Sequence, residues 1–163
     1  LLLKGPLHAQ SLIRVPFIYT DPHTKGVPIC DAVSGTIDIS ATILNRAGLA
    51  GYHGIQGRSL LPEIETGEDH GRGAWIIEEE SQWAMFGLDP PVRLKTLVTE
   101  DWRVSLYDGS DLAEMYDLRS DPHEMNNLWN DTDHIAVQAA LMERMAREMI
   151  HYTDLSPAPR RRA

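Results

Sequence analysis

Apolar runs in the second half of the chain have the length and composition of β-strands. The first run covers residues 74–77 and is followed by three glutamates. Two more, at 94–99 and 102–107, are separated by two acidic residues, which predicts a hairpin. After the turn signal Asp108-Gly109-Ser110, residues 114–117 can return as a third antiparallel strand beside this hairpin. The pattern therefore predicts a small antiparallel sheet.

A different spacing of apolar residues indicates helices. Between residues 37 and 47 these positions fall on one helical face and Gly48 ends the pattern, which predicts a helix capped by Ser34 or Thr36. Near the C-terminus, apolar residues recur at intervals of four from Val137 to Met149. This recurrence predicts an amphipathic helix from residue 131 or 132 to about 152.

Two shorter segments also suggest local structure. The apolar run at 15–19 contains Pro16 and leads into a turn, so we predict a short buried strand. Asp121, Pro122 and Glu124 match the start of a helix, with the aspartate as N-cap and the glutamate as its capping-box partner. We therefore predict a turn of helix there.

Composition excludes several classes of function. The formal net charge of −9 repels phosphate backbones, so we expect no nucleic-acid partner. No apolar run approaches the roughly 18 residues of a membrane span, so we expect a soluble protein without membrane contact. The single cysteine, Cys30, excludes an internal disulfide, which suits the cytoplasm but also many periplasmic proteins.

Three segments carry motifs in order along the chain. The first is Lys4 on a Gly-Pro loop, followed by Arg14-Val15-Pro16. The second is residues 35–49, where Ala41 stands in place of a usual proline, and the third is residues 114–128. Together they resemble the second half of arylsulfatase-type sulfatases, in the alkaline-phosphatase-like superfamily. The last segment is similar to that family's Leu-Tyr-Asp-Leu-x-x-Asp-Pro-x-Glu-x-x-Asn-Leu motif.

The resemblance implies an α+β fold with a defined division. Residues 1–62 would be the C-terminal remnant of a main α/β catalytic domain, and 63–73 a polar linker. Residues 74–156 would form a small antiparallel sheet packed against a C-terminal helix. The last residues, 157–163, would be a flexible, proline-rich and arginine-rich tail.

The resemblance also implies a chemistry. Members of the family hydrolyse sulfate esters with a hydrated formylglycine nucleophile and a divalent cation, calcium by family analogy. Lys4 aligns with the lysine that contacts the sulfate, so it is the candidate catalytic and substrate-binding residue. The nucleophile motif Cys/Ser-x-Pro-x-Arg is absent, and the metal-binding carboxylates would precede residue 1. We therefore expect the isolated chain to be inactive, with no metal site of its own.

Other candidates near the lysine are less specific. His8 and Ala9 stand where many sulfatases carry Tyr-Glu, so His8 is either a substrate contact or a packing residue. Arg14 is expected to be structural, satisfying carbonyls or a carboxylate. The acidic run 78–80 alternates between strand faces and cannot converge on one ion, so it is expected to be a solvated rim.

Several alternatives stay open. The apolar residues Trp83, Met85 and Phe86 can line a leaving-group pocket or pack in the core. The parent enzyme can instead be a phosphonate or phosphate monoester hydrolase on the same scaffold. The chain can also be a non-catalytic folding or oligomerisation module. Apolar surface around 15–18 and 37–44 would then be exposed and would favour a homo-oligomer.

Overall fold

The computed structural model describes residues 7–23, 25, 29–68, 71–81 and 91–153. Lys4, Trp83, Met85 and Phe86 lie outside these ranges. The chain divides into two compact units, the first made of Leu1–Ile18 and Ala74–Met149 and the second of Tyr19–Gly73 and Ile150–Ala163. The division expected at 62 and 73 refers to the domains of a longer protein and stays a prediction.

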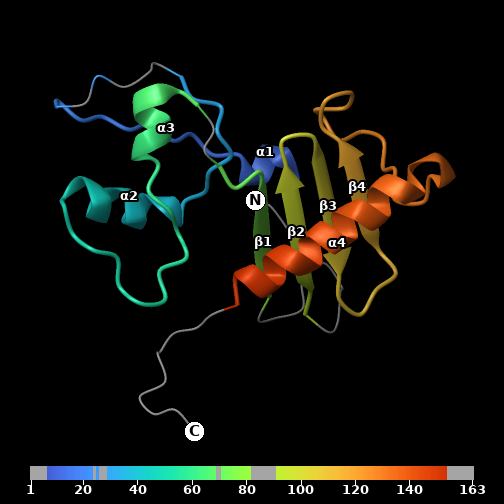
Figure 1. Ribbon diagram of the computed structural model, residues 1–163. Coiled ribbons are helices and arrows are strands. Elements are labelled where there is room, and N and C mark those ends of the chain that lie inside the picture. Colours follow the sequence, from blue (N-terminus) through green and yellow to red (C-terminus); the bar gives the residue numbers. More distant parts are fainter. Residues whose placement is uncertain (1–6, 24, 26–28, 69–70, 82–90, 154–163) are drawn as a thin grey trace, which may run out of the picture. The chain divides into compact units, whose positions relative to one another are not determined.

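A four-stranded antiparallel sheet lies at the centre of the first unit (Figure 1). Its strands are neighbours in chain order: β1 Ala74–Glu80, β2 Arg93–Thr99, β3 Trp102–Tyr107 and β4 Ala113–Asp117. The predicted hairpin is confirmed as β2 and β3, and the predicted third strand as β4. The acidic run after residue 77 continues β1 rather than leaving it.

One face of the sheet carries the apolar core and packs against helix α4, Ile135–His151 (Figure 1). Because alternate strand residues point to opposite faces, core residues of one strand lie two positions apart, as Trp102, Val104 and Leu106 do on β3. The core consists of buried residues from the strands and the helix: Ala74, Leu97, Val104, Met115, Leu141 and Met145. The α+β arrangement of a small sheet covered by the C-terminal helix is therefore confirmed.

The start of the C-terminal helix is also as predicted. The side chain of Asp131 accepts a hydrogen bond from the backbone N–H of Asp133 at 2.9 Å. This bond opens a short 3-10 turn, Thr132–His134, which leads directly into α4. None of the helices in the described ranges is both long enough and apolar enough to cross a lipid bilayer.

The second unit contains α2, Asp38–Arg46, and α3, Leu61–Thr66. The predicted helix at 37–47 is confirmed as α2, but the predicted cap is wrong because its N-cap residue, Ile37, makes no side-chain cap bond. The buried carboxylate of Asp38 accepts backbone N–H bonds from Gly35 at 3.3 Å and Arg58 at 2.8 Å instead. A carboxylate inside the first turn thus satisfies local donors, as a capping hydroxyl would.

Helix α3 was not anticipated, because it lies where a polar linker was expected. Pro62 stands in its first turn and Gly67 ends it in the left-handed region at φ 77°. Both are ordinary signals of helix ends, but the helix has only six residues, too few for a clear apolar periodicity. The buried carboxylate of Glu63 pairs with the Arg58 guanidinium, which fixes α3 against the preceding loop.

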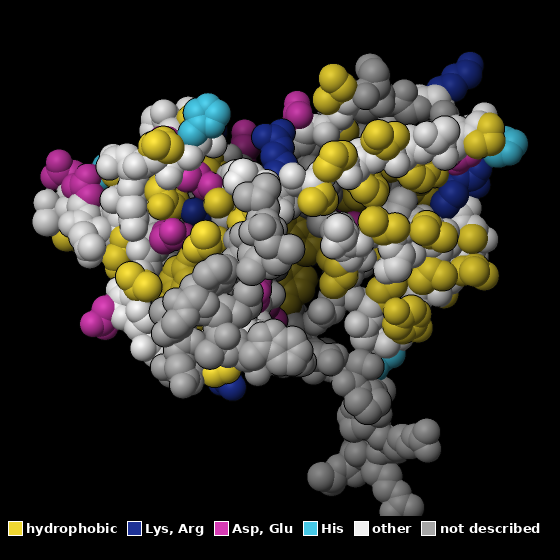
Figure 2. All heavy atoms as spheres, turned by 180° about the vertical axis from the view of Figure 1, so that it is seen from behind, with side chains coloured by type: hydrophobic (Ala, Val, Ile, Leu, Met, Phe, Trp, Pro, Cys, Tyr) yellow, Lys and Arg dark blue, Asp and Glu magenta, His cyan; other side chains and the backbone are white. Residues whose placement is uncertain are grey.

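The buried strand predicted at 15–19 is wrong. No residue of this run is in a strand, and Phe17 and Ile18 are 44% and 86% exposed. A strand needs a neighbour for its backbone hydrogen bonds, and the sheet in the described residues is made of β1 to β4 alone. Figure 2 shows hydrophobic side chains at the surface in several places, in keeping with such exposed residues.

The turn of helix predicted after Asp121 is also wrong. Its carboxylate accepts the backbone N–H of Asn126 at 2.8 Å, which closes a turn instead of opening a helix. Glu124, the expected capping-box partner, has a φ of 56° and cannot continue a right-handed helix. The same motif therefore serves a non-helical loop.

Candidate functional site

Of the two site residues predicted from the sequence, the structure describes His8 but not Lys4. Lys4 lies outside the described residues, so its role stays a prediction. His8 is described and is 3% exposed. Its Nδ1 shares a hydrogen bond of 2.9 Å with Oγ1 of Thr96, and its Nε2 lies 3.6 Å from a carboxylate oxygen of Glu79. The imidazole is thus packed against β2 and β1 in the described structure.

His8 belongs to a polar cluster on the sheet face opposite α4. Thr96 on β2 shares a hydrogen bond of 2.7 Å with Ser105 on β3. The Arg103 guanidinium donates from Nη1 to Ser105 at 2.7 Å and to Glu114 at 3.0 Å. These residues occupy alternate strand positions, so the pleat directs them all to one face.

Glu124 closes the cluster on its other side. One carboxylate oxygen accepts from Arg103 Nε, and the other accepts the backbone N–H of Gln10 at 2.7 Å. Gln10 begins α1, Gln10–Ile13, which is separated from His8 only by its N-cap residue Ala9. Among the described residues, Glu124 is the one non-glycine residue with positive φ, a conformation that persists where surrounding contacts enforce it.

Arg103 and the neighbouring Tyr107 keep their protonation states near neutral pH. Arg103 is 1% exposed, and burial alone would lower its pKa, but the hydrogen bonds to Glu124 and Glu114 raise it above the usual value. Burial, followed by the Glu114 charge, raises the pKa of Tyr107 to about 12. Neither group changes protonation near neutral pH, so they serve geometry rather than acid-base chemistry.

The ring of Tyr116 covers one side of the guanidinium, with Arg103 Cζ 4.7 Å from the ring centroid. A cation over an aromatic face is attracted to the ring electrons, which compensates part of the lost hydration. Burial and the nearby Glu114 charge raise the pKa of Tyr116 as well. Arg103 therefore has partners on β3, on β4 and in the 121–126 turn.

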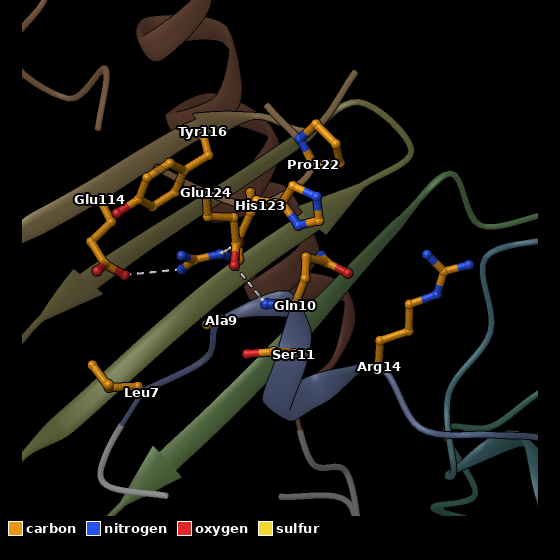
Figure 3. Close-up of a pocket in the computed structure, with 11 residues that line it drawn as sticks. Leu7, Ala9, Gln10, Ser11, Arg14, Glu114, Tyr116, Pro122, His123 and Glu124 are labelled. Atoms are coloured by element: carbon orange, nitrogen blue, oxygen red, sulfur yellow. Dashed lines mark hydrogen bonds and ion pairs between the residues drawn. The ribbon is translucent and has the colours of Figure 1, made fainter. Parts of the chain in front are cut away.

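A hollow of about 520 Å³ lies beside the cluster (Figure 3). Its wall is formed by α1, by β4 and by the turn with His123 and Glu124. In Figure 3 the side chain of Arg14 points away from Glu114 and Glu124. Both carboxylates are already paired with Arg103, so the hollow offers no free anionic ligands from them.

The acidic run on β1 divides between the two faces, as its position on a strand predicts. Glu79 lies near His8, whereas Glu78 and Glu80 flank Lys95 Nζ at 2.5 and 3.8 Å. Within the described residues, no three or more His, Cys, Asp or Glu side chains are grouped so that they could hold a metal ion. The described part therefore provides no ligand set for the divalent cation that the family resemblance implies.

Sequence reasoning missed the buried polar cluster itself. The sheet face that carries it mixes polar residues, such as Arg103 and Ser105 on β3, with apolar ones, such as Leu94 and Val98 on β2, so no regular alternation marks it. That this face is covered becomes apparent when His8 and Gln10 are seen to contact residues 88 and 114 positions away. Such pairings leave no local signal in one sequence.

Comparisons with known proteins identify the fold. Residues 4–151 match the family described as N-sulphoglucosamine sulphohydrolase, C-terminal. The chain belongs to this family. Its resemblance to sulfatases, recognised from the three motifs, is thereby confirmed.

Curated relatives agree. Over 147 residues the chain is 29% identical to the N-acetylglucosamine-6-O-sulfatase of Bacteroides thetaiotaomicron, covering 88% of this chain and 26% of that protein. Over 128 residues it is 30% identical to arylsulfatase K of Homo sapiens, covering 73% of this chain and 23% of that protein. The chain thus spans about a quarter of the length of these relatives.

Solved structures share the architecture. A protein solved in complex with its substrate D-glucosamine-2-N,6-O-disulfate aligns at a TM-score of 0.68 and 28% identity, over 81% of this chain and 27% of that one. The phosphonate monoester hydrolase of Agrobacterium radiobacter aligns at a TM-score of 0.66 and 25% identity, over 78% and 27%. The fold is therefore common to sulfatases and phosphonate hydrolases.

Proposed function

We propose that this chain is the C-terminal part of a sulfuric ester hydrolase and contributes a sulfate-contacting lysine together with the C-terminal subdomain. The family match over residues 4–151 carries this proposal. It is supported by relatives named as sulfatases and by the alignment to a structure whose substrate carries sulfate groups.

In the proposed reaction, Lys4 acts as a cation at the sulfuryl group. Negative charge accumulates on the sulfuryl and leaving-group oxygens in the transition state, and a positioned ammonium in a dry site stabilises that charge more than the ground state. Lys4 is the first residue of the family match. The role is carried over from the family resemblance.

The nucleophile and the cation belong, in this proposal, to the rest of the enzyme. A hydroxyl of a hydrated formylglycine would attack sulfur, and a divalent cation, calcium by family analogy, would supply Lewis-acid stabilisation of the sulfuryl group. Because the described residues offer no metal-binding group, no step is assigned to the cation within this chain. His8 stays a candidate substrate contact in the complete enzyme, although here it is buried against Thr96.

Replacing Lys4 in the complete enzyme tests the proposal. We expect Lys4→Ala to lower kcat for an aryl sulfate by about 100-fold, the usual cost of removing one charge-stabilising group. Lys25→Ala, at an exposed lysine of the second unit, is the matched control and should leave kcat unchanged. Equal rates for the two variants would contradict the assignment of Lys4.

The isolated chain offers a second test. With calcium and an aryl sulfate present, we expect no turnover above the uncatalysed rate, because the chain lacks the Cys/Ser-x-Pro-x-Arg nucleophile motif. Measurable turnover that disappears with the Lys4→Ala variant would show that the chain carries a nucleophile of its own. Such a result would overturn its role as an incomplete part.

A phosphonate monoester hydrolase is the second candidate, because such an enzyme shares this fold at a TM-score of 0.66. The two are distinguished by comparing kcat/KM of the complete enzyme for an aryl sulfate, a 6-O-sulfated glucosamine and a phenyl phosphonate monoester. Preference for either sulfate supports the proposal. Preference for the phosphonate assigns the second candidate, and hydrolysis of none of them would favour a non-catalytic folding or oligomerisation module.

A further inference from the structure

We propose that the buried polar cluster is an anchor that positions the segment next to Lys4 for catalysis. The anchor consists of five side chains and one backbone N–H: His8, Thr96, Ser105, Arg103, Glu124 and the N–H of Gln10. It goes beyond the proposed function, which gives a role to only one of these groups, His8 as a candidate substrate contact, but its catalytic part rests on that function. His8 and Glu124 are positioning residues in this scheme, and they act through Lys4.

The hydrogen bonds of the anchor form a closed circuit. From His8 it runs through Thr96 at 2.9 Å and Ser105 at 2.7 Å, and on to Arg103 at 2.7 Å. Arg103 then bonds Glu124, whose second oxygen returns to the N–H of Gln10 at 2.7 Å. The circuit therefore begins and ends on one short segment, which is held at two points only two residues apart.

The anchor is also costly in ways that simple packing would avoid. It buries a guanidinium at 1% exposure, whereas apolar residues of similar volume often stabilise a fold as well or better. Glu124 additionally adopts a positive φ of 56° to reach both of its partners. Strained residues of this kind are concentrated at functional sites. These features favour a role in fixing geometry.

Chain length connects the anchor to Lys4. Lys4 precedes His8 by four positions, so the backbone between them can extend at most about 14 Å. Fixing His8 to the sheet and Gln10 to the 121–126 turn therefore limits the volume within which the ammonium can lie. Loss of the anchor would release the fixed end of this short tether, and a misplacement of the ammonium by about 1 Å can lower a catalytic rate by up to about 100-fold.

Two variants of Thr96 test the anchor in the complete enzyme. Thr96→Val keeps the side-chain shape and removes the hydroxyl that joins His8 to Ser105, whereas Thr96→Ser keeps the hydroxyl. We expect the valine variant to exchange the amide hydrogens of residues 9–14 at least tenfold faster and to lower kcat about tenfold with little change in KM. The serine variant should behave as wild type.

A variant of Glu124 provides an independent route if valine at position 96 prevents folding. Glu124→Ala removes the acceptor of the Gln10 N–H and should accelerate exchange in the same segment. Unchanged exchange in both variants would overturn the anchor. Faster exchange with unchanged kcat would overturn its role in positioning Lys4.

The anchor and the proposed function fail in distinguishable ways. If the wild-type enzyme hydrolyses no sulfate ester, the proposed function is wrong, and the exchange measurement still decides whether the network holds residues 9–14. A purely structural network would instead lower the free energy of unfolding without a local change in exchange. That result would overturn the proposal, because thermal unfolding of each variant separates a global effect from a local one.

Discussion

Aspartate carboxylates organise three loops of the first unit at the scale of single residues. Asp117, Asp121 and Asp131 each accept bonds from backbone N–H groups two to five positions further along. Short polar side chains compete for backbone donors in this way both at helix starts and in turns. Identical chemistry therefore explains why the motif at Asp121 predicted a helix and yet forms a turn.

The pH dependence of folding should report on Asp121. Bonds from the Met125 and Asn126 backbone lower its pKa in the folded state. Its stabilising contribution is thus complete above the unfolded-state pKa of about 3.9, and it is lost as the pH falls through the lower folded-state value. We expect Asp121→Asn to flatten this part of the stability profile, measured by denaturant unfolding between about pH 6 and pH 2.

Asp111 provides the control for that measurement. It is an exposed aspartate in the turn before β4, and Asp111→Asn removes the same charge without removing the bonds that Asp121 accepts. We expect this variant to keep the acid dependence of the wild type. The same flattening in both variants would mean that net charge, rather than the turn, causes the dependence.

At the scale of elements, one face of the sheet could be predicted and the other could not. Alternating apolar positions in the strands and the four-residue recurrence in α4 both identify an apolar face, and the two faces pack together. The other face mixes polar residues with Leu94 and Val98 of β2, so its pattern does not indicate what covers it; His8 packs on it, and α1 next to His8 is bonded to Glu124. Partners more than 80 positions away decide this, so the candidate anchor could not be predicted.

The same limit applies to the first unit's N-terminal segment. The run at 15–19 has strand-like composition, but a strand forms only where another edge accepts its backbone bonds. Composition indicates that the segment could form a strand, but not whether another strand is available to pair with it. The hairpin of β2 and β3 was predictable because its two strands are adjacent in sequence and supply each other's bonds.

Packing between α4 and the sheet should depend on the buried face of the helix. Met145 is 2% exposed and contacts the sheet core, whereas Met149, one turn later, is 41% exposed. We expect Met145→Ala to lower the free energy of unfolding by about 2–5 kcal/mol, because it removes buried contacts and leaves a cavity. Met149→Ala, which makes the same chemical change, should lower it by well under half as much, as measured by denaturant unfolding.

Comparison of the two methionine variants separates packing from helix propensity. Both substitutions introduce alanine, which favours the helix equally at neighbouring turns. A difference between them therefore measures burial against the sheet. Similar losses at the two positions would contradict the packing of α4 through Leu141 and Met145.

At the scale of the whole molecule, both units expose large apolar side chains to solvent, which is energetically unfavourable. Ile18 is 86% exposed in the first unit, and Ile43 is 60% exposed in the second. Single exposed apolar residues are common, but within each unit further apolar residues close in sequence, such as Phe17 and Ile39, are also exposed, as is usual for a contact surface. In the proposed enzyme the remaining three quarters of the chain can cover them. The isolated chain has no such cover.

We therefore expect the isolated chain to self-associate. The protein concentration at which half of it is associated should rise when these residues are made polar. Ile18→Ser and Ile43→Ser should each weaken association in sedimentation equilibrium, because each removes apolar area worth about 25 cal/mol per Å². Leu112→Ser, at a leucine that is 61% exposed beside β4, is the control and should leave association unchanged. A clean monomer at high concentration would contradict the prediction. If the complete enzyme associates equally strongly and responds to the same two variants, these residues form a subunit interface and are not covered by its own chain.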